Sequence, residues 1–145
     1  MLTYKNNDPY IEGTSLYDLV KVCQTPFYVY SQQKIINQVN KTKEILGNNI
    51  FYSIKSNSNQ AILKLMNSLD LGADVVSVGE LKRALEAGFN PNKIIFEGVG
   101  KSEQDLLYAM HKNIRLINTE SLEEIKLLDN LANEKNKIVD IGVRL

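Results

Sequence analysis

The sequence has one cysteine, one histidine and no tryptophan among its 145 residues. A single cysteine, Cys23, excludes an internal disulfide and a cysteine-cluster metal site, and it predicts a reducing setting such as the cytoplasm. Lys and Arg total 17, as do Asp and Glu, so no basic field attracts nucleic acid or an anionic membrane. No apolar run reaches the roughly 18 residues of a membrane-spanning helix, and the N-terminus does not look like a signal peptide. We expect a cytoplasmic, globular protein with no nucleic-acid, membrane or metal partner.

Apolar spacing divides the chain into alternating strands and helices. The first part predicts a helix at 15–23 capped by Ser15, an opening strand at 27–30, and a helix at 31–46 capped by Ser31. Four strand–helix pairs and a fifth strand follow, with strands at 50–55, 73–78, 93–98, 114–118 and 137–145. Strict alternation of this kind requires parallel strands joined by right-handed helical crossovers.

Two architectures fit this alternation: an open doubly wound sheet, or part of an eight-stranded barrel. A complete barrel needs about 250 residues, so this chain could hold only about half of one. Parallel (β/α) repeats predict an α/β fold and leave both architectures open. Residues 1–30 would hold an N-terminal helix and the opening strand, and residues 31–145 the parallel (β/α) repeats.

Polar residues gather where the expected strands end, which is the binding face of parallel α/β folds. They are Lys55, Ser77, Lys101, Asn118 and Arg144, and the glycines Gly79 and Gly98 accompany Ser77 and Lys101. Lys55 stands out because strand alternation turns it to the same side as Phe51 and Ser53, toward the interior. Burial favours the neutral, nucleophilic amine, which can form a Schiff base. The alternative is an ordinary solvated lysine.

The segment IIFEGVGKS, residues 94–102, resembles the end of a nucleotide-binding P-loop. That pattern, G-x-x-x-x-G-K-[ST], needs a glycine five places before Gly100, where this sequence has Ile95. The remaining loop is too short to surround phosphates. We therefore assign Lys101 to an ordinary loop and Ser102 to a helix N-cap.

Several segments in colinear order resemble the fold-type III pyridoxal-phosphate decarboxylases, in particular the diaminopimelate decarboxylases. YSIKSN (52–57) is similar to their lysine motif Y-A-x-K-A-N. The other similar segments are TPFYVYS (25–31), GADVVSVGEL (72–81), IIFEGVGKS (94–102), INTESLEEI (117–125) and GVRL (142–145). Ser56 and Val78 depart from the alanine and glycine usual at their positions.

The resemblance implies that residues 31–145 form roughly half of a TIM-type (β/α)8 barrel of the alanine racemase-like type, which binds pyridoxal phosphate. The enzyme would decarboxylate meso-2,6-diaminopimelate to L-lysine and CO2 in lysine biosynthesis. Lys55 would hold the cofactor as a Schiff base, Asp74 and Arg144 would lie beside it, and Asn57 would shape the following loop. Glu80 is assigned to the start of a helix, where a carboxylate is favourable. The alternatives are a decarboxylase of another basic amino acid, such as ornithine or arginine, and a non-catalytic remnant or binding module.

The resemblance also implies that this chain is an N-terminal part. The rest of the barrel and a β-rich domain would lie beyond Leu145, and the complete enzyme would be a homodimer. Without them the strands at 50–55 and 138–145 are open edges, so we expect aggregation or association with a second copy or a C-terminal fragment. His111 is expected to be exposed at the end of a helix, and Cys23 to be buried.

Overall fold

The structure, a computed structural model that describes residues 2–145, divides into two compact units, one ending at Gly47 and one starting at Asn48. The first unit begins with the antiparallel strands β1 (Leu2–Lys5), β2 (Asp8–Ile11) and β3 (Thr14–Ser15), which pair in that order. Asn6 and Asn7 link the first two strands with φ values of 50° and 64°. Consecutive positive φ values are typical of type I′ hairpin turns, which favour asparagine. This hairpin is not among the predicted elements, because its short strands lack a clear apolar alternation.

Helices α1 (Leu16–Val22) and α2 (Gln32–Leu46) complete the first unit. Their N-caps are Ser15 and Ser31, as predicted, and the Ser31 hydroxyl accepts a hydrogen bond from the Lys34 N–H at 3.1 Å. Two predictions are wrong here. Residues 27–30 form no strand, because no strand among residues 2–145 pairs with them. Cys23 is exposed, because α1 has no buried side chain for it to join.

The division after Gly47 also differs from the boundary that we predicted after residue 30. Helix α2 groups with the N-terminal unit. Since α2 has no buried side chain, its apolar stripe does not indicate to which unit it belongs.

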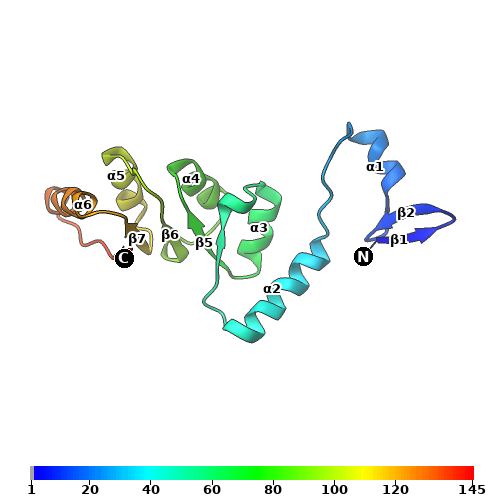
Figure 1. Ribbon diagram of the computed structural model, residues 1–145, viewed down its shortest axis with the longest axis horizontal. Coiled ribbons are helices and arrows are strands. Elements are labelled where there is room, and N and C mark those ends of the chain that lie inside the picture. The colour runs from blue at the N-terminus through cyan, green and yellow to red at the C-terminus, as the bar shows by residue number, and fades with distance from the viewer. Residues whose placement is uncertain (1) are drawn as a thin grey trace. The chain divides into compact units, whose positions relative to one another are not determined.

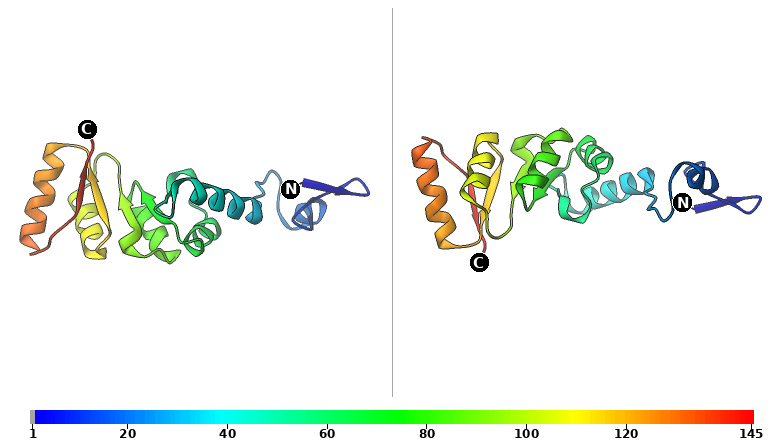
Figure 2. Two further views of the ribbon diagram at one scale, coloured as in Figure 1. Left: turned by 90° about the horizontal axis from the view of Figure 1, so that it is seen from below. Right: turned by 90° about the horizontal axis from the view of Figure 1, so that it is seen from above.

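The second unit repeats a strand and a helix along the chain (Figure 1). Its elements are β4 (Phe51–Ser53), the 3₁₀ turn η1 (Ile54–Ser56), α3 (Gln60–Ser68), β5 (Gly72–Val75), α4 (Val78–Glu86), the 3₁₀ turn η2 (Pro91–Lys93), β6 (Ile94–Phe96), α5 (Glu103–Lys112), β7 (Leu116–Thr119), α6 (Leu122–Glu134) and β8 (Ile141–Val143). The predicted succession of four strand–helix pairs and a fifth strand is confirmed. Figure 2 shows α6 beside the C-terminal strand.

The five strands are all parallel and lie in the order β4-β5-β6-β7-β8. Because every crossover joins neighbouring strands with the same hand, all the helices fall on one face of the sheet. A doubly wound sheet would need a reversal of strand order. The order is therefore that of a barrel segment, and the predicted fold class is confirmed.

The two faces of this sheet differ in their side chains. Ala73, Val75, Ile94, Phe96 and Ile117 are buried against the helices, which contribute Leu63, Leu81, Leu106 and Leu128. Each fully buried Val, Leu, Ile or Phe side chain among them stabilises the fold by about 1.5–3 kcal/mol. The side chains of opposite parity on β4 to β7 are only half-buried. We call their side of the sheet the inner face; its central row is Ser53, Asp74, Ile95 and Leu116, which are paired in register.

Candidate functional site

Polar side chains of the inner face lie at the carboxyl ends of the strands. Those that follow the inner-face parity are Ser53, Asp74, Glu97, Asn118 and Arg144. Residues of the same parity on neighbouring parallel strands project to the same side. We call this polar edge, together with the loops that follow the strands, the rim.

Lys55 lies on the rim but outside the strand that we predicted it to end. Strand β4 stops at Ser53, and a 3₁₀ turn follows, in which side chains step by a third of a turn instead of alternating. Ile54 is fully buried and Lys55 is exposed. The prediction of a desolvated lysine from strand parity is therefore wrong.

The loop after Lys55 is held by Asn57, as predicted. The Asn57 side-chain oxygen accepts a hydrogen bond from the Asn59 N–H at 3.0 Å, and its backbone carbonyl accepts one from the Tyr52 hydroxyl at 3.0 Å. Ser56 donates to the Ser53 carbonyl at 2.7 Å. These contacts tie the lysine turn back to β4.

Two buried polar atoms on the inner face, Ser53 Oγ and Asp74 Oδ1, have no hydrogen-bond partner among residues 2–145. Ser53 and Asp74 are register partners on β4 and β5. Leaving a buried polar atom unsatisfied costs on the order of 1–3 kcal/mol, and more when the group is charged. The ends of β4 and β5 therefore have unused capacity to bind a polar group close to Lys55.

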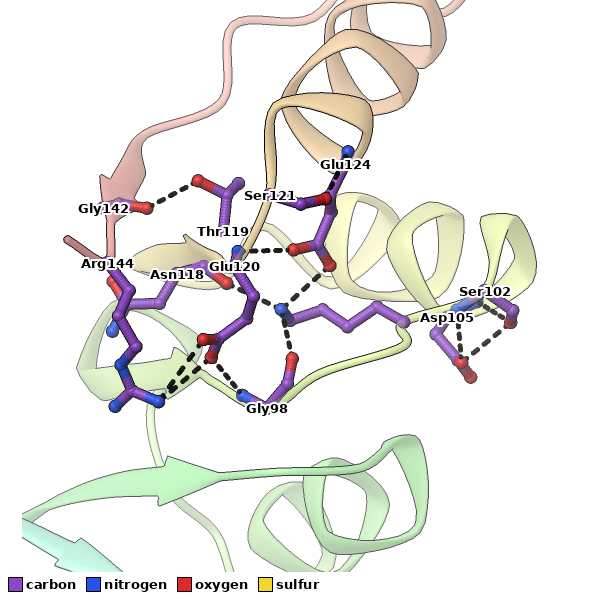
Figure 3. A network of polar contacts seen from close by, with 11 residues as sticks. Gly98, Ser102, Asp105, Asn118, Thr119, Glu120, Ser121, Glu124, Gly142 and Arg144 are labelled. Carbon is purple, nitrogen blue, oxygen red and sulfur yellow. Dashed lines mark hydrogen bonds and ion pairs between the residues drawn. The ribbon is translucent and has the colours of Figure 1, made fainter.

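Arg144 lies on the rim between two carboxylates, those of Glu97 and Glu120. Figure 3 shows its contact with Glu120. Its Nη2 is 3.3 Å from Glu97 Oε2, and its Nη1 is 3.2 Å from Glu120 Oε1. Its side chain remains 59% exposed. No hydrogen bond or ion pair within residues 2–145 joins it to Lys55 or Asp74. The structure thus places the three predicted site residues on one rim without bringing them into contact.

Glu80 has the helix-start role that we assigned to it. Its carboxylate accepts a hydrogen bond from the Val76 N–H at 2.9 Å, and its own N–H donates to Ser77 Oγ, the N-cap of α4, at 3.2 Å. The rim residue Ser77 is therefore occupied with capping. At the start of α5, Ser102 and Asp105 form a full capping box.

Two hydrogen bonds from Ser102 reach Asp105 Oδ2, one from its hydroxyl at 2.7 Å and one from its backbone N–H at 2.9 Å. Both favour the ionised carboxylate, and they hold the pKa of Asp105 below its ordinary value of 3.8. His111 lies exposed in the last turn of the same helix, as predicted.

Sequence reasoning missed the burial of Lys101. The Lys101 side chain is only 2% exposed, and its Nζ lies 3.0 Å from Glu124 Oε1. The glycines before it, Gly98 and Gly100, both have positive φ. These two glycines were the feature of the sequence that could have indicated the burial of Lys101. They let the loop turn sharply enough to bring the lysine back against Glu124.

No helix among residues 2–145 is long and apolar enough to cross a membrane. In the same residues, no group of three or more histidine, cysteine, aspartate or glutamate side chains could hold a metal ion.

A parallel barrel sheet with a lysine and an unsatisfied aspartate at its strand ends defines a class, the barrel domains that bind a small ligand at the carboxyl ends of their strands. Residues 32–145 match the family model "Pyridoxal-dependent decarboxylase, pyridoxal binding domain". The chain belongs to this family of pyridoxal-dependent decarboxylases, and the family prediction and its cofactor, pyridoxal phosphate, are confirmed.

Similar curated proteins are diaminopimelate decarboxylases. That of Aquifex aeolicus is 36% identical over 145 residues, covering 99% of this chain and 34% of the relative. That of Haemophilus influenzae is 37% identical, covering 98% and 35%. That of Campylobacter jejuni is 43% identical over 124 residues, covering 83% and 31%. The chain therefore spans about a third of the length of the curated relatives it matches.

Solved structures agree. AQ1208 from Aquifex aeolicus superimposes with a TM-score of 0.93 at 36% identity, covering 99% of this chain and 36% of that one. Diaminopimelate decarboxylase from Helicobacter pylori, complexed with L-lysine, gives 0.85 at 38% identity, covering 89% and 34%. The arginine decarboxylase of a Chlorella virus gives 0.76 at 20% identity, covering 90% and 35%, which shows the shared fold alone.

Proposed function

We propose that this chain supplies the cofactor lysine of an enzyme that decarboxylates meso-2,6-diaminopimelate to L-lysine and CO2. The observation that carries the proposal is the position of Lys55 just past β4, next to the unsatisfied Ser53 and Asp74. The buried, unpaired Asp74 oxygen is also the test of fit for the cofactor, because a bound polar ligand would relieve it. The diaminopimelate decarboxylases named above, at 36–43% identity, support the choice of substrate.

Each predicted residue has a distinct part in this proposal. Lys55 would hold pyridoxal phosphate covalently through Nζ, which must first give up a proton to become a nucleophile. Asp74 Oδ1 would accept a hydrogen bond from a donor at the site. Arg144 would present its guanidinium from the opposite part of the rim. Pyridoxal phosphate, when bound, takes up the electron pair that the departing CO2 leaves on the α-carbon, and a proton then replaces the carboxylate.

The alternatives are less well supported. Decarboxylases of arginine and of lysine or ornithine share this fold at only 18–21% identity, so they say nothing about substrate choice. If the chain is a non-catalytic binding module, the cofactor should bind at Lys55 without turnover of a substrate.

The test is an absorbance spectrum of the purified protein with pyridoxal phosphate, followed by borohydride reduction and peptide mapping. We expect one dominant reduced adduct, on Lys55, which Lys55→Met abolishes and the exposed-site control Lys64→Met leaves intact. Release of CO2 from meso-diaminopimelate in preference to ornithine, assayed with the C-terminal fragment supplied, would then establish the substrate. Scattered labelling of surface lysines would sink the proposal, and a Lys55 adduct without CO2 release in the presence of that fragment would favour the binding module.

We also propose a cytoplasmic location and a partner that completes the rim. The single, unpaired Cys23 suits a reducing compartment. The free edges of β4 and β8 suit a second copy or a C-terminal fragment of the same enzyme.

A further inference from the structure

Lys101 is bound on every side although it lies next to an exposed rim. Its Nζ donates to the Gly98 carbonyl at 2.7 Å, the Asn118 carbonyl at 2.6 Å and Glu124 Oε1 at 3.0 Å. Three acceptors match the three protons of an ammonium group. Lys101 therefore has no donor left for a ligand. Its role in the P-loop-like segment 94–102 is to bind groups of the protein itself.

One path of contacts leads from Lys101 to Arg144 through two glutamates. Glu124 binds Lys101 with one carboxylate oxygen and accepts the Glu120 N–H with the other, at 2.8 Å. The Glu120 carboxylate in turn accepts the Gly98 N–H at 3.2 Å and pairs with Arg144. Gly98 is thus held at its carbonyl by Lys101 and at its N–H by Glu120. Figure 3 shows Glu120 lying between Gly98 and Arg144.

A second path runs along the inner face. The Asn118 carbonyl binds Lys101, and the Asn118 side-chain amide donates to Glu97 Oε1 at 2.8 Å. The other oxygen of Glu97 pairs with Arg144. The two paths therefore form a closed ring of contacts that joins the ends of β6, β7 and β8.

Only one cation of this ring is buried. The side chain of Lys101 is 2% exposed and that of Glu124 is 10% exposed, whereas Arg144 is 59% exposed. Buried, charge-assisted hydrogen bonds hold their geometry more firmly than exposed ion pairs do. Lys101 is therefore the fixed cation of the ring, and Arg144 is the cation that can adjust its position.

We propose that Lys101 is a positioning residue that sets the place of the Arg144 guanidinium on the rim through Glu124, Glu120 and Gly98. Gly98 has a φ of 97°. Glycine has many backbone conformations available to it, so the contacts at its N–H and at its carbonyl are needed to hold it in this one. The consequence for catalysis rests on the proposed function, which places Arg144 beside the cofactor. The ring itself rests on the contacts alone.

The test measures how fast phenylglyoxal modifies Arg144 relative to the exposed Arg115 in the same sample, by peptide mapping of the full chain. Lys101→Met removes the buried charge without contacting Arg144, and Lys64→Met is its exposed control. Glu120→Gln removes the carboxylate that faces Arg144, and Glu123→Gln, at an exposed position in the first turn of α6, is its control. Circular dichroism shows which variants fold.

We expect the relative rate at Arg144 to rise by about two- to threefold in Lys101→Met and Glu120→Gln, the size expected for loss of a partly exposed ion pair. Neither control should change it. A folded Lys101→Met that reacts at the wild-type rate would overturn the positioning role. Should Lys101→Met not fold, Glu120→Gln decides, and a wild-type rate there would show that the ring does not hold Arg144. Borohydride trapping of pyridoxal phosphate on Lys55, in wild-type protein, tests the proposed function separately and leaves the Arg144 comparison intact.

Discussion

Gly72 lies on β5 where the ring of Phe51, its register partner on β4, crosses the inner face. A Cβ atom at residue 72 would lie 2.4 Å from Phe51 Cδ1 and 2.8 Å from the Lys93 carbonyl oxygen. The ring could rotate away, but the backbone oxygen has little freedom to move. The position therefore requires glycine for space and not for its backbone angles.

We predict that Gly72→Ala lowers the free energy of unfolding by about 2 kcal/mol, the usual size of an overpacking penalty. Urea denaturation followed by circular dichroism measures it. Gly79→Ala is the matched control, since the nearest atom to its Cβ lies 3.6 Å away. Equal stability of the two variants would show that β4 and β5 separate at little cost.

At the scale of a helix, the start of α5 links stability to pH. The depressed pKa of Asp105 means that its ionisation stabilises the folded chain. That contribution is fully present above the ordinary value of 3.8 and is lost as the pH falls through the lower, folded-state pKa.

We predict that Asp105→Asn destabilises the protein at pH 7 by about 0.5 kcal/mol, typical of a lost carboxylate in a first helical turn. The difference from wild type should shrink at pH 3, below the ordinary pKa of 3.8, because the unfolded chain then binds a proton at Asp105 that folding must release. Urea midpoints at both pH values measure this, with Asp129→Asn in the middle of α6 as control. A difference that grows at pH 3 would contradict the assignment.

At the scale of the whole molecule, β8 pairs with β7 on one side and with no other strand of residues 2–145. Its Val143 is 55% exposed, and Ile138, in the preceding loop, is 99% exposed. Unpaired strand edges with apolar side chains promote self-association.

We predict that Val143→Lys reduces the concentration-dependent increase in apparent mass, as measured by light scattering. Ile138→Lys makes the same chemical change off the strand and should have a smaller effect. An equal effect of both would indicate general apolar adhesion in place of edge pairing.

Residues 32–145 match a pyridoxal-binding domain, and a large part of its fold could be predicted from local sequence. Ser31, Ser102 and Ser121 mark helix starts because their side chains satisfy the free N–H groups of their own first turn. The strand–helix alternation predicted parallel strands for a similar reason, since each crossover is short and has one favoured hand. The colinear motifs, among them the one around Lys55, identified the family.

Contacts between distant segments could not be read in this way. The strand expected at 27–30 lacks a pairing partner, and Cys23 lacks a surface to cover it. Lys55 does not point to the side of the sheet that strand alternation predicts, because β4 ends before it and a 3₁₀ turn follows. Lys101 became buried because Asn118 and Glu124, from the next repeat, meet it there. The sequence by itself determined the strand–helix succession of the second unit and the family, because these depend on neighbours along the chain. Only the tertiary structure decided which charges are buried and what holds Arg144, because those depend on residues that the fold brings together.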